Sequence, residues 1–137
     1  MVIGYKLSLV KLIYLLVHAD GNINQKEIQS GLYAAKCEGI SEIDYHTIIE
    51  SLKKRNPSVL YAEAVEVLKK QPHEIQVRYI TWLCLIANAD GFMDTAEWQL
   101  IYKLYNVELK LPLDEIMKMQ KELMVANVRK IVLPAFA

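Results

Sequence analysis

The 137-residue sequence predicts an all-α fold: a single pseudo-symmetric helical domain of about seven to eight helices from an internal duplication. Apolar residues recur at helical spacing in one segment after another, and no segment shows the period-two alternation of a strand over a useful length. A nine-residue turn also occurs twice, at 19–27 and 89–97, with the shared pattern A-D-G-x-(apolar)-(Asn/Asp)-x-x-E. The expected repeats are 1–70 and 71–137, packed as one domain.

The first two helices flank the first copy of this turn. Segment 4–19 carries apolar residues on more than one helical face, which predicts a central helix covered on most sides. Asn24 is expected to cap a second helix that runs to about Lys36. Gly31 lies inside that helix, where glycine costs about 1 kcal/mol relative to alanine, so we expect a close helix crossing at this point.

Two further helices complete the first half. Ser41 can cap a third helix, and the Asn-Pro pair at 56–57 ends it because proline disfavours helical geometry in the residue before it. A fourth helix is expected to start at Ser58 and to close before Pro72.

The second half is expected to repeat this plan. Segment 75–89 is as apolar as the first helix, and Asp94 can cap the helix that follows. That helix is expected to bury Trp98, Ile101 and Tyr105. A helix from about 113 to 125 comes next, and Asn127 is expected to cap a last short helix that Pro134 stops.

Composition excludes several classes of protein. Lysine plus arginine equals aspartate plus glutamate, 16 each, and 53% of the residues are hydrophobic. The chain is therefore too apolar for disorder and too evenly charged for a domain that binds nucleic acid by neutralising phosphates. Cys37 and Cys84 lie inside predicted helices at non-equivalent repeat positions, which does not indicate a disulfide framework. No stretch predicts a membrane span or a signal peptide, so we expect a cytoplasmic protein.

The repeated turn invites comparison with the calcium-binding loop of an EF-hand. If Gly21 is placed at loop position six, Asp20 falls at position five and Glu27 at position twelve, as that loop requires. The second copy matches in the same way. Position one should be an aspartate ligand, however, and in the first copy it is Leu16. The remaining oxygen ligands are few for a cation that takes six to eight.

Helix capping explains the motif without an ion, and we favour this interpretation. The aspartate after alanine can form an Asx-turn, the glycine supplies a positive φ, and the last four residues of each copy fit a capping box. A divalent-cation site remains the alternative because the acidic residues recur at matched positions. Its candidate ligands are Asp20, Asn24, Glu27, Asp90, Asp94 and Glu97.

The sequence shows no catalytic set and no certain cofactor site. His18, His46 and His73 lie at unrelated repeat positions and lack the ligand spacing of a zinc site. Cys84 lies in an apolar helix, as expected of an inert core thiol. No glycine-rich phosphate loop or nucleophile elbow is present.

The pattern carries a family resemblance. A long apolar helix ends in A-D-G, and an apolar residue, an Asn/Asp cap and a glutamate three residues further on follow it. This arrangement is repeated after about 70 residues in a helical chain. In these features the sequence resembles the TerB-like family of tellurite-resistance proteins. DnaJ-like membrane co-chaperones carry a similar helical domain. The resemblance implies a cytoplasmic bacterial domain of stress-resistance systems, without enzymatic activity, and an acidic, metal-binding surface at the six residues above. Asn24 departs from the fully acidic pattern.

The sequence thus leads to two hypotheses of different classes. The first is a non-enzymatic stress-response domain that binds or scaffolds protein partners, with no nucleic acid and no direct membrane span. The second is a divalent-cation sensor of calcium-like specificity that uses the two turns. The partner and the ion stay open, as does the oligomeric state, for which a homodimer is one option.

Overall fold

The computed structural model describes residues 4–89, 91 and 93–136, with side chains up to residue 124. Its elements in chain order are α1 (Gly4–Val17), α2 (Gln25–Cys37), α3 (Glu42–Leu52), α4 (Pro57–Lys69), α5 (His73–Ala87), α6 (Thr95–Tyr102), the π-helix η1 (Lys103–Glu108) and α7 (Leu113–Phe136). No strand occurs among these described residues. The predicted all-α single domain of about seven helices is confirmed.

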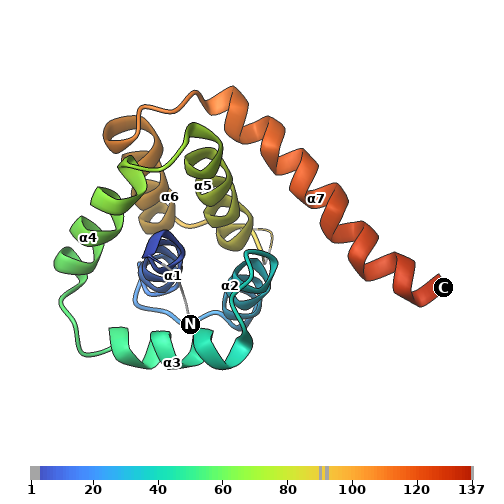
Figure 1. Cartoon of the computed structure of the whole chain (residues 1–137), viewed down its shortest axis with the longest axis horizontal. Coiled ribbons are helices and arrows are strands. Elements are labelled where there is room, and N and C mark those ends of the chain that lie inside the picture. Colours follow the sequence, from blue (N-terminus) through green and yellow to red (C-terminus); the bar gives the residue numbers. More distant parts are fainter. Residues whose placement is uncertain (1–3, 90, 92, 137) are drawn as a thin grey trace.

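α1 is the central helix of the domain. It lies among the others in Figure 1 and contacts α2, α3, α4, α5 and α6. Leu9, Leu12, Ile13 and Leu16 are completely buried. A helix with apolar residues all round is stable only when it is covered all round, which is why this sequence places it in the middle. α1 and α5 each end two residues earlier than expected, at Val17 and Ala87.

α2 crosses α1 closely at Gly31. A Cβ atom at this position would lie 2.7 Å from Cγ2 of Ile13 and 3.0 Å from the hydroxyl oxygen of Tyr45. These distances leave no room for a side chain. The close crossing expected from the interior glycine is therefore confirmed.

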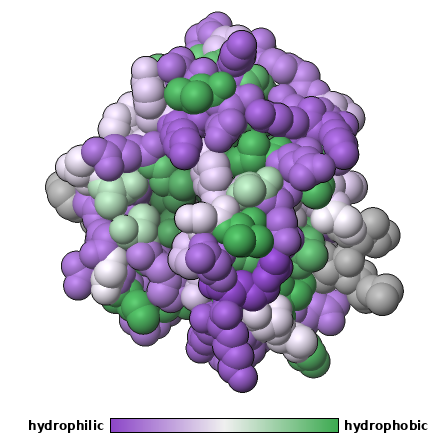
Figure 2. All heavy atoms as spheres, turned by 90° about the vertical axis from the view of Figure 1, so that its left-hand side faces the viewer, coloured by the Kyte–Doolittle hydropathy of each residue, from purple (hydrophilic) through white to green (hydrophobic). Residues whose placement is uncertain are grey.

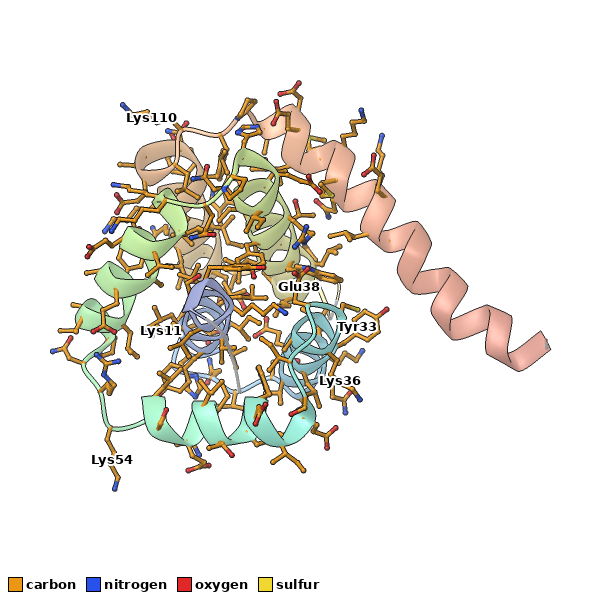
Figure 3. All side chains as sticks on the ribbon, in the orientation of Figure 1. Lys11, Tyr33, Lys36, Glu38, Lys54 and Lys110 are labelled. Carbon is orange, nitrogen blue, oxygen red and sulfur yellow. The ribbon has the colours of Figure 1, made fainter. Side chains whose placement is uncertain are left out.

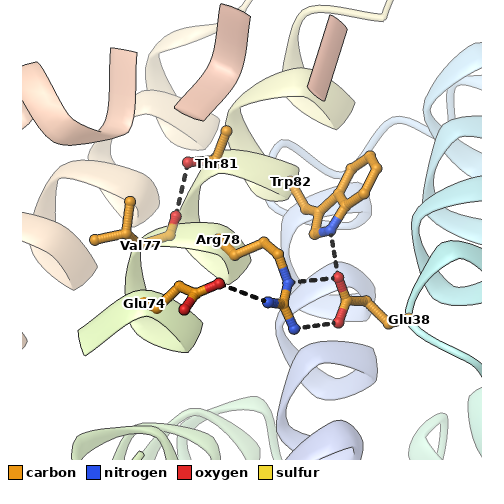
Figure 4. Close-up of polar contacts among 6 residues, drawn as sticks. All are labelled: Glu38, Glu74, Val77, Arg78, Thr81 and Trp82. Atoms are coloured by element: carbon orange, nitrogen blue, oxygen red, sulfur yellow. Dashed lines mark hydrogen bonds and ion pairs between the residues drawn. The ribbon is translucent and has the colours of Figure 1, made fainter. Parts of the chain in front are cut away.

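A buried carboxylate joins the end of α2 to α5. Both oxygens of Glu38 accept hydrogen bonds from Arg78, each at 2.8 Å, and Oε2 also accepts one from Nε1 of Trp82 at 2.9 Å (Figure 4). The Trp82 ring in turn packs edge-on against Tyr33 of α2, with the centroids 6.2 Å apart. This cluster fixes the position of α2 relative to α5.

α4 begins one residue earlier than predicted. Pro57 is its first residue, and the Asn56 side chain accepts a hydrogen bond from the backbone N–H of Ser58 at 2.8 Å. Proline suits the first position of a helix because its missing N–H would have no partner there. The same Asn-Pro pair therefore ends one helix and starts the next.

The predicted burial of Trp98 is wrong. Its side chain is 42% exposed, whereas Ile101 is completely buried and Tyr105 is 6% exposed. The inner face of α6 runs through Glu97 and Ile101, and Trp98 lies about 100° further round the helix. The helix therefore turns Trp98 towards solvent.

The predicted break near Asn127 is also wrong. α7 runs without interruption from Leu113 to Phe136, so Asn127 does not start a new helix and Pro134 lies inside the last turns. Asn127 follows methionine, valine and alanine in an already formed helix, and continuing that helix adds one hydrogen bond per residue. α7 packs mainly on α5, and its second half projects past the rest of the domain (Figure 1).

The surface is mixed in character. On the side of α4, apolar side chains form separate patches among polar ones (Figure 2). Lys54 and Lys110 extend into solvent, whereas Lys11 lies among the helices and its Nζ contacts Oε1 of Glu63 at 2.9 Å (Figure 3). In the part of the chain that the structure describes, no helix has both the length and the apolar character needed to cross a membrane.

Candidate functional site

The first turn has the Asn24 cap that the sequence predicts. Oδ1 of Asp20 accepts a hydrogen bond from the backbone N–H of Asn22 at 2.9 Å, and Gly21 has a φ of 79°. Oδ1 of Asn24 accepts from the N–H groups of Lys26 at 2.8 Å and Glu27 at 3.2 Å. These bonds satisfy N–H groups that the start of α2 leaves without helical partners.

The second turn contains a complete capping box. Oδ1 of Asp94 accepts from the N–H of Glu97 at 2.9 Å, and Oε1 of Glu97 accepts from the N–H of Asp94 at 3.1 Å. Gly91 has a φ of 84°, close to that of Gly21. The predicted structural role of Asp94 and Glu97 is confirmed, whereas Asp90 lies outside the described residues.

The structure brings the two turns together. The Asp94 side chain hydrogen-bonds the carboxylate of Asp20 and, with the N–H of Asn22, lowers the pKa of Asp20 below its ordinary value. Two carboxylates that lie this close repel each other when both are ionised. Residues 74 positions apart in the chain therefore form one acidic pair, which we call the Asp20–Asp94 pair.

Two further carboxylates of the turns are buried. Glu27 is 5% exposed and Glu97 is 3% exposed, each in the first turn of its helix. The N-terminal end of a helix favours negative charge, which offsets part of the cost of burying these groups. Their burial is consistent with the capping role, and for Glu97 the hydrogen bond to the Asp94 N–H shows it directly.

The acidic residues of the turns have the oxygen ligands that a hard cation prefers, but too few of them lie together. Carboxylate and amide oxygens are the ligands that calcium prefers. Among the described residues, however, no three histidine, cysteine, aspartate or glutamate side chains are arranged to hold a metal ion. The Asp20–Asp94 pair offers two carboxyl groups, and its Oδ1 atoms already accept backbone N–H groups. A full coordination shell would need further oxygen ligands.

The other candidate residues stay outside any such arrangement. Cys84 is buried, and burial raises the pKa of its thiol to about 11, so the thiolate that a nucleophile needs is scarce. His18 and His46 lie at a cavity between α1 and α3, and His73 contacts Glu115 between α5 and α7. These positions agree with the absence of zinc-ligand spacing among the histidines and with the core position expected for Cys84.

Sequence reasoning missed an exposed aromatic cluster on α6 and η1. Trp98 and Tyr102 are 42% and 43% exposed, and both rings pack against Tyr105, with centroids 6.1 and 5.5 Å away. We call these three residues the aromatic face. The sequence signal for this cluster is the i, i+4, i+7 spacing of its three aromatic residues. Because buried residues on one side of a helix have the same spacing, this signal does not distinguish an exposed cluster from a buried one.

The fold and the paired turns define a class of protein: an all-α domain in which two apolar helices each end at an acidic, glycine-containing turn and a capped helix follows. The chain belongs to the family described as tellurite resistance protein TerB, whose model matches residues 6–120. No curated protein and no solved structure matches the chain.

Proposed function

We propose that this chain is a non-enzymatic interaction domain of a bacterial stress-response system, tellurite resistance being the one that the family's description names. The aromatic face carries the proposal, because Trp98 and Tyr102 present two large rings to solvent on one side of a short helix. The proposal places the protein in the cytoplasm, as the family resemblance implies.

Physical chemistry supports a protein partner for this face. Tryptophan and tyrosine are enriched among the residues that dominate binding energy, since each offers a large rigid area at low entropic cost. Tyr105 lies behind both exposed rings and is itself buried, so the rings are held in place before a partner arrives. Such preorganisation reduces the cost of binding.

The test compares the proteins that the wild-type chain and the double variant Trp98→Ser/Tyr102→Ser retain from a lysate of the native host. We expect at least one protein to be retained by the wild type and lost from the double variant. Val59→Ser is the matched control, because Val59 is 47% exposed on α4 and lies outside the aromatic face.

A growth assay on tellurite adds a functional readout. If the aromatic face recruits the partner of a resistance system, the double variant will protect cells less than the wild type at equal protein level. Identical retained proteins and identical protection by both chains would contradict the proposal. Circular dichroism establishes that the variants are folded.

A second candidate function, divalent-cation sensing, is favoured by one observation: the two acidic turns meet at the Asp20–Asp94 pair. A cation held there would remove the repulsion between the two carboxylates and link the starts of α2 and α6. Calcium calorimetry tests this candidate. A saturable heat lost in Asp20→Asn would support sensing, and a flat titration would exclude calcium as the ligand.

A further inference from the structure

A cavity of about 190 Å³ opens between α1, α2 and α3, on a different side of α1 from α6. Its walls are mostly apolar and come from all three helices. They include Ile13, Val17, Ile28, Tyr45 and Ile49. Ile23, which is 62% exposed in the first turn, lies at the same cavity.

The size and lining of this cavity favour a small apolar guest over water. The cavity is open at its rim, where His18, Ile23 and Lys53 are exposed, and its largely apolar walls offer water few of the two to four polar partners that it needs. Apolar cavities of roughly 150 Å³ take up a benzene-sized molecule. A cavity of about 190 Å³ has room for one aromatic ring with one or two small substituents.

Three polar residues, His18, His46 and Lys53, line the same cavity. Lys53 already pairs with Glu50, at 2.8 Å, so its charge is balanced within the protein. The cavity therefore offers no unbalanced positive charge from lysine to attract an anion, which favours a neutral guest.

His18 supplies a placed hydrogen-bond acceptor. Its Nδ1 lies 2.8 Å from the carbonyl oxygen of Tyr14, and a carbonyl only accepts, so Nδ1 carries the hydrogen. In the neutral ring the lone pair is then on Nε2. The ring also packs against Tyr14, with the centroids 4.4 Å apart, which holds it in position.

From these observations we infer that the cavity is a binding site for a small neutral aromatic molecule that carries one hydrogen-bond donor, of the phenol or indole class. The ring occupies the apolar space between Ile28 and Ile49, and the donor bonds Nε2 of His18. This site contains no residue of the aromatic face, and its rim includes Ile23 of the first turn.

The test titrates p-cresol into the ¹⁵N-labelled chain at pH 8. We expect saturable shifts of resonances around the cavity, with a Kd on the order of 0.1–1 mM for a ligand of this size. Toluene, which lacks the donor, is expected to bind about three- to tenfold more weakly, as is p-cresol to His18→Leu.

Two filling variants and one control locate the site. Ile49→Phe and Ile28→Phe occupy the cavity and are expected to abolish the shifts, each checked for folding by thermal melting. Ile43→Phe lies on the same helix as Ile49 but is 79% exposed and outside the cavity, so it is expected to bind like the wild type.

Several results would overturn the inference. Wild-type protein that shows no saturable shift with 5 mM p-cresol has no such site, and the cavity would then be open to an apolar side chain of a protein partner. Equal affinity for toluene and p-cresol would remove the role of His18. Undiminished binding to a folded filling variant would place the ligand elsewhere.

Discussion

Replacing Glu38 by alanine tests the junction between α2 and α5. The substitution removes the carboxylate to which both Arg78 and Trp82 donate hydrogen bonds and leaves Arg78 the 3.8 Å contact with Glu74 (Figure 4). The Glu38 side chain is 8% exposed and that of Arg78 is 27% exposed. In the variant, the Trp82 N–H loses its partner inside the protein, whereas water reaches part of the guanidinium.

The magnitude follows from these exposures. Breaking a fully buried ion pair by removing one partner costs about 3–5 kcal/mol. Because Arg78 is partly exposed and can be rehydrated, we expect a smaller loss, about 2–3 kcal/mol of the free energy of unfolding. For a domain of this size that loss lowers the melting temperature by about 10 °C.

Urea unfolding followed by circular dichroism measures this free energy. Glu74→Gln is the matched control, since Glu74 contacts the same Arg78 from 3.8 Å but is 77% exposed, and we expect a change below about 0.5 kcal/mol. If Glu38→Ala matched the wild type within that margin, the cluster would not hold α2 against α5 and the assigned energetics would be wrong.

Local features of the site could be predicted from the sequence, whereas contacts between distant residues could not. The caps formed by Asn24 and Asp94 depend on residues within three positions, so their spacing was sufficient. The meeting of Asp20 with Asp94 depends on how two helix pairs pack, and no local pattern encodes it. No local pattern singles out Glu38 either, because its partners lie 40 and 44 residues away.

The fold errors have a related cause. Periodicity places Trp98 and Tyr105 on one stripe, but it does not say which edge of a stripe the neighbouring helices cover. In the structure α6 turns Ile101 inward and leaves Trp98 at the exposed edge. The internal duplication stays a prediction, supported by the matched turns after α1 and α5.

Three further predictions concern stability. Gly31→Ala is expected to destabilise the fold by about 1–2 kcal/mol, because the clash with the buried Ile13 outweighs the gain in helix propensity, whereas Gln29→Ala on the exposed side of α2 is expected to be neutral in the same urea melts. Hydrogen bonds from Arg55 and Lys11 lower the pKa of Glu63 to about 2, so Glu63 stabilises the fold above its ordinary pKa of 4.5 and this stabilisation is lost as the pH falls towards 2. The melting temperature is expected to depend less on pH across that range for Glu63→Gln than for the wild type. Glu66 is 74% exposed, so Glu66→Gln is expected to keep the pH dependence of the wild type. The same pH dependence for Glu63→Gln and the wild type would contradict the assignment. Asn24→Ala and Asp94→Ala are each expected to cost about 1 kcal/mol through loss of a cap, with or without an ion, and unchanged urea midpoints for both would refute the capping role.

The last prediction concerns calcium and the paired turns. A ligand stabilises the folded state by RT ln(1 + [L]/Kd), so a site with a sensor-like Kd of about 10 µM would add about 2.7 kcal/mol at 1 mM free calcium. That gain would raise the melting temperature by several degrees. The described residues bring only two carboxyl groups together, so we expect calcium to leave the melting temperature unchanged.

Asp20→Asn separates the two interpretations of the turn. Asparagine can still accept the hydrogen bond from the N–H of Asn22, so the turn itself is kept, whereas one of the two charges that would attract a cation is lost. If the pair is structural, wild type and variant will melt alike with and without calcium. A calcium-dependent rise that disappears in Asp20→Asn would show that the Asp20–Asp94 pair contributes to a calcium site, and cation sensing would then replace capping as the main role of the turns.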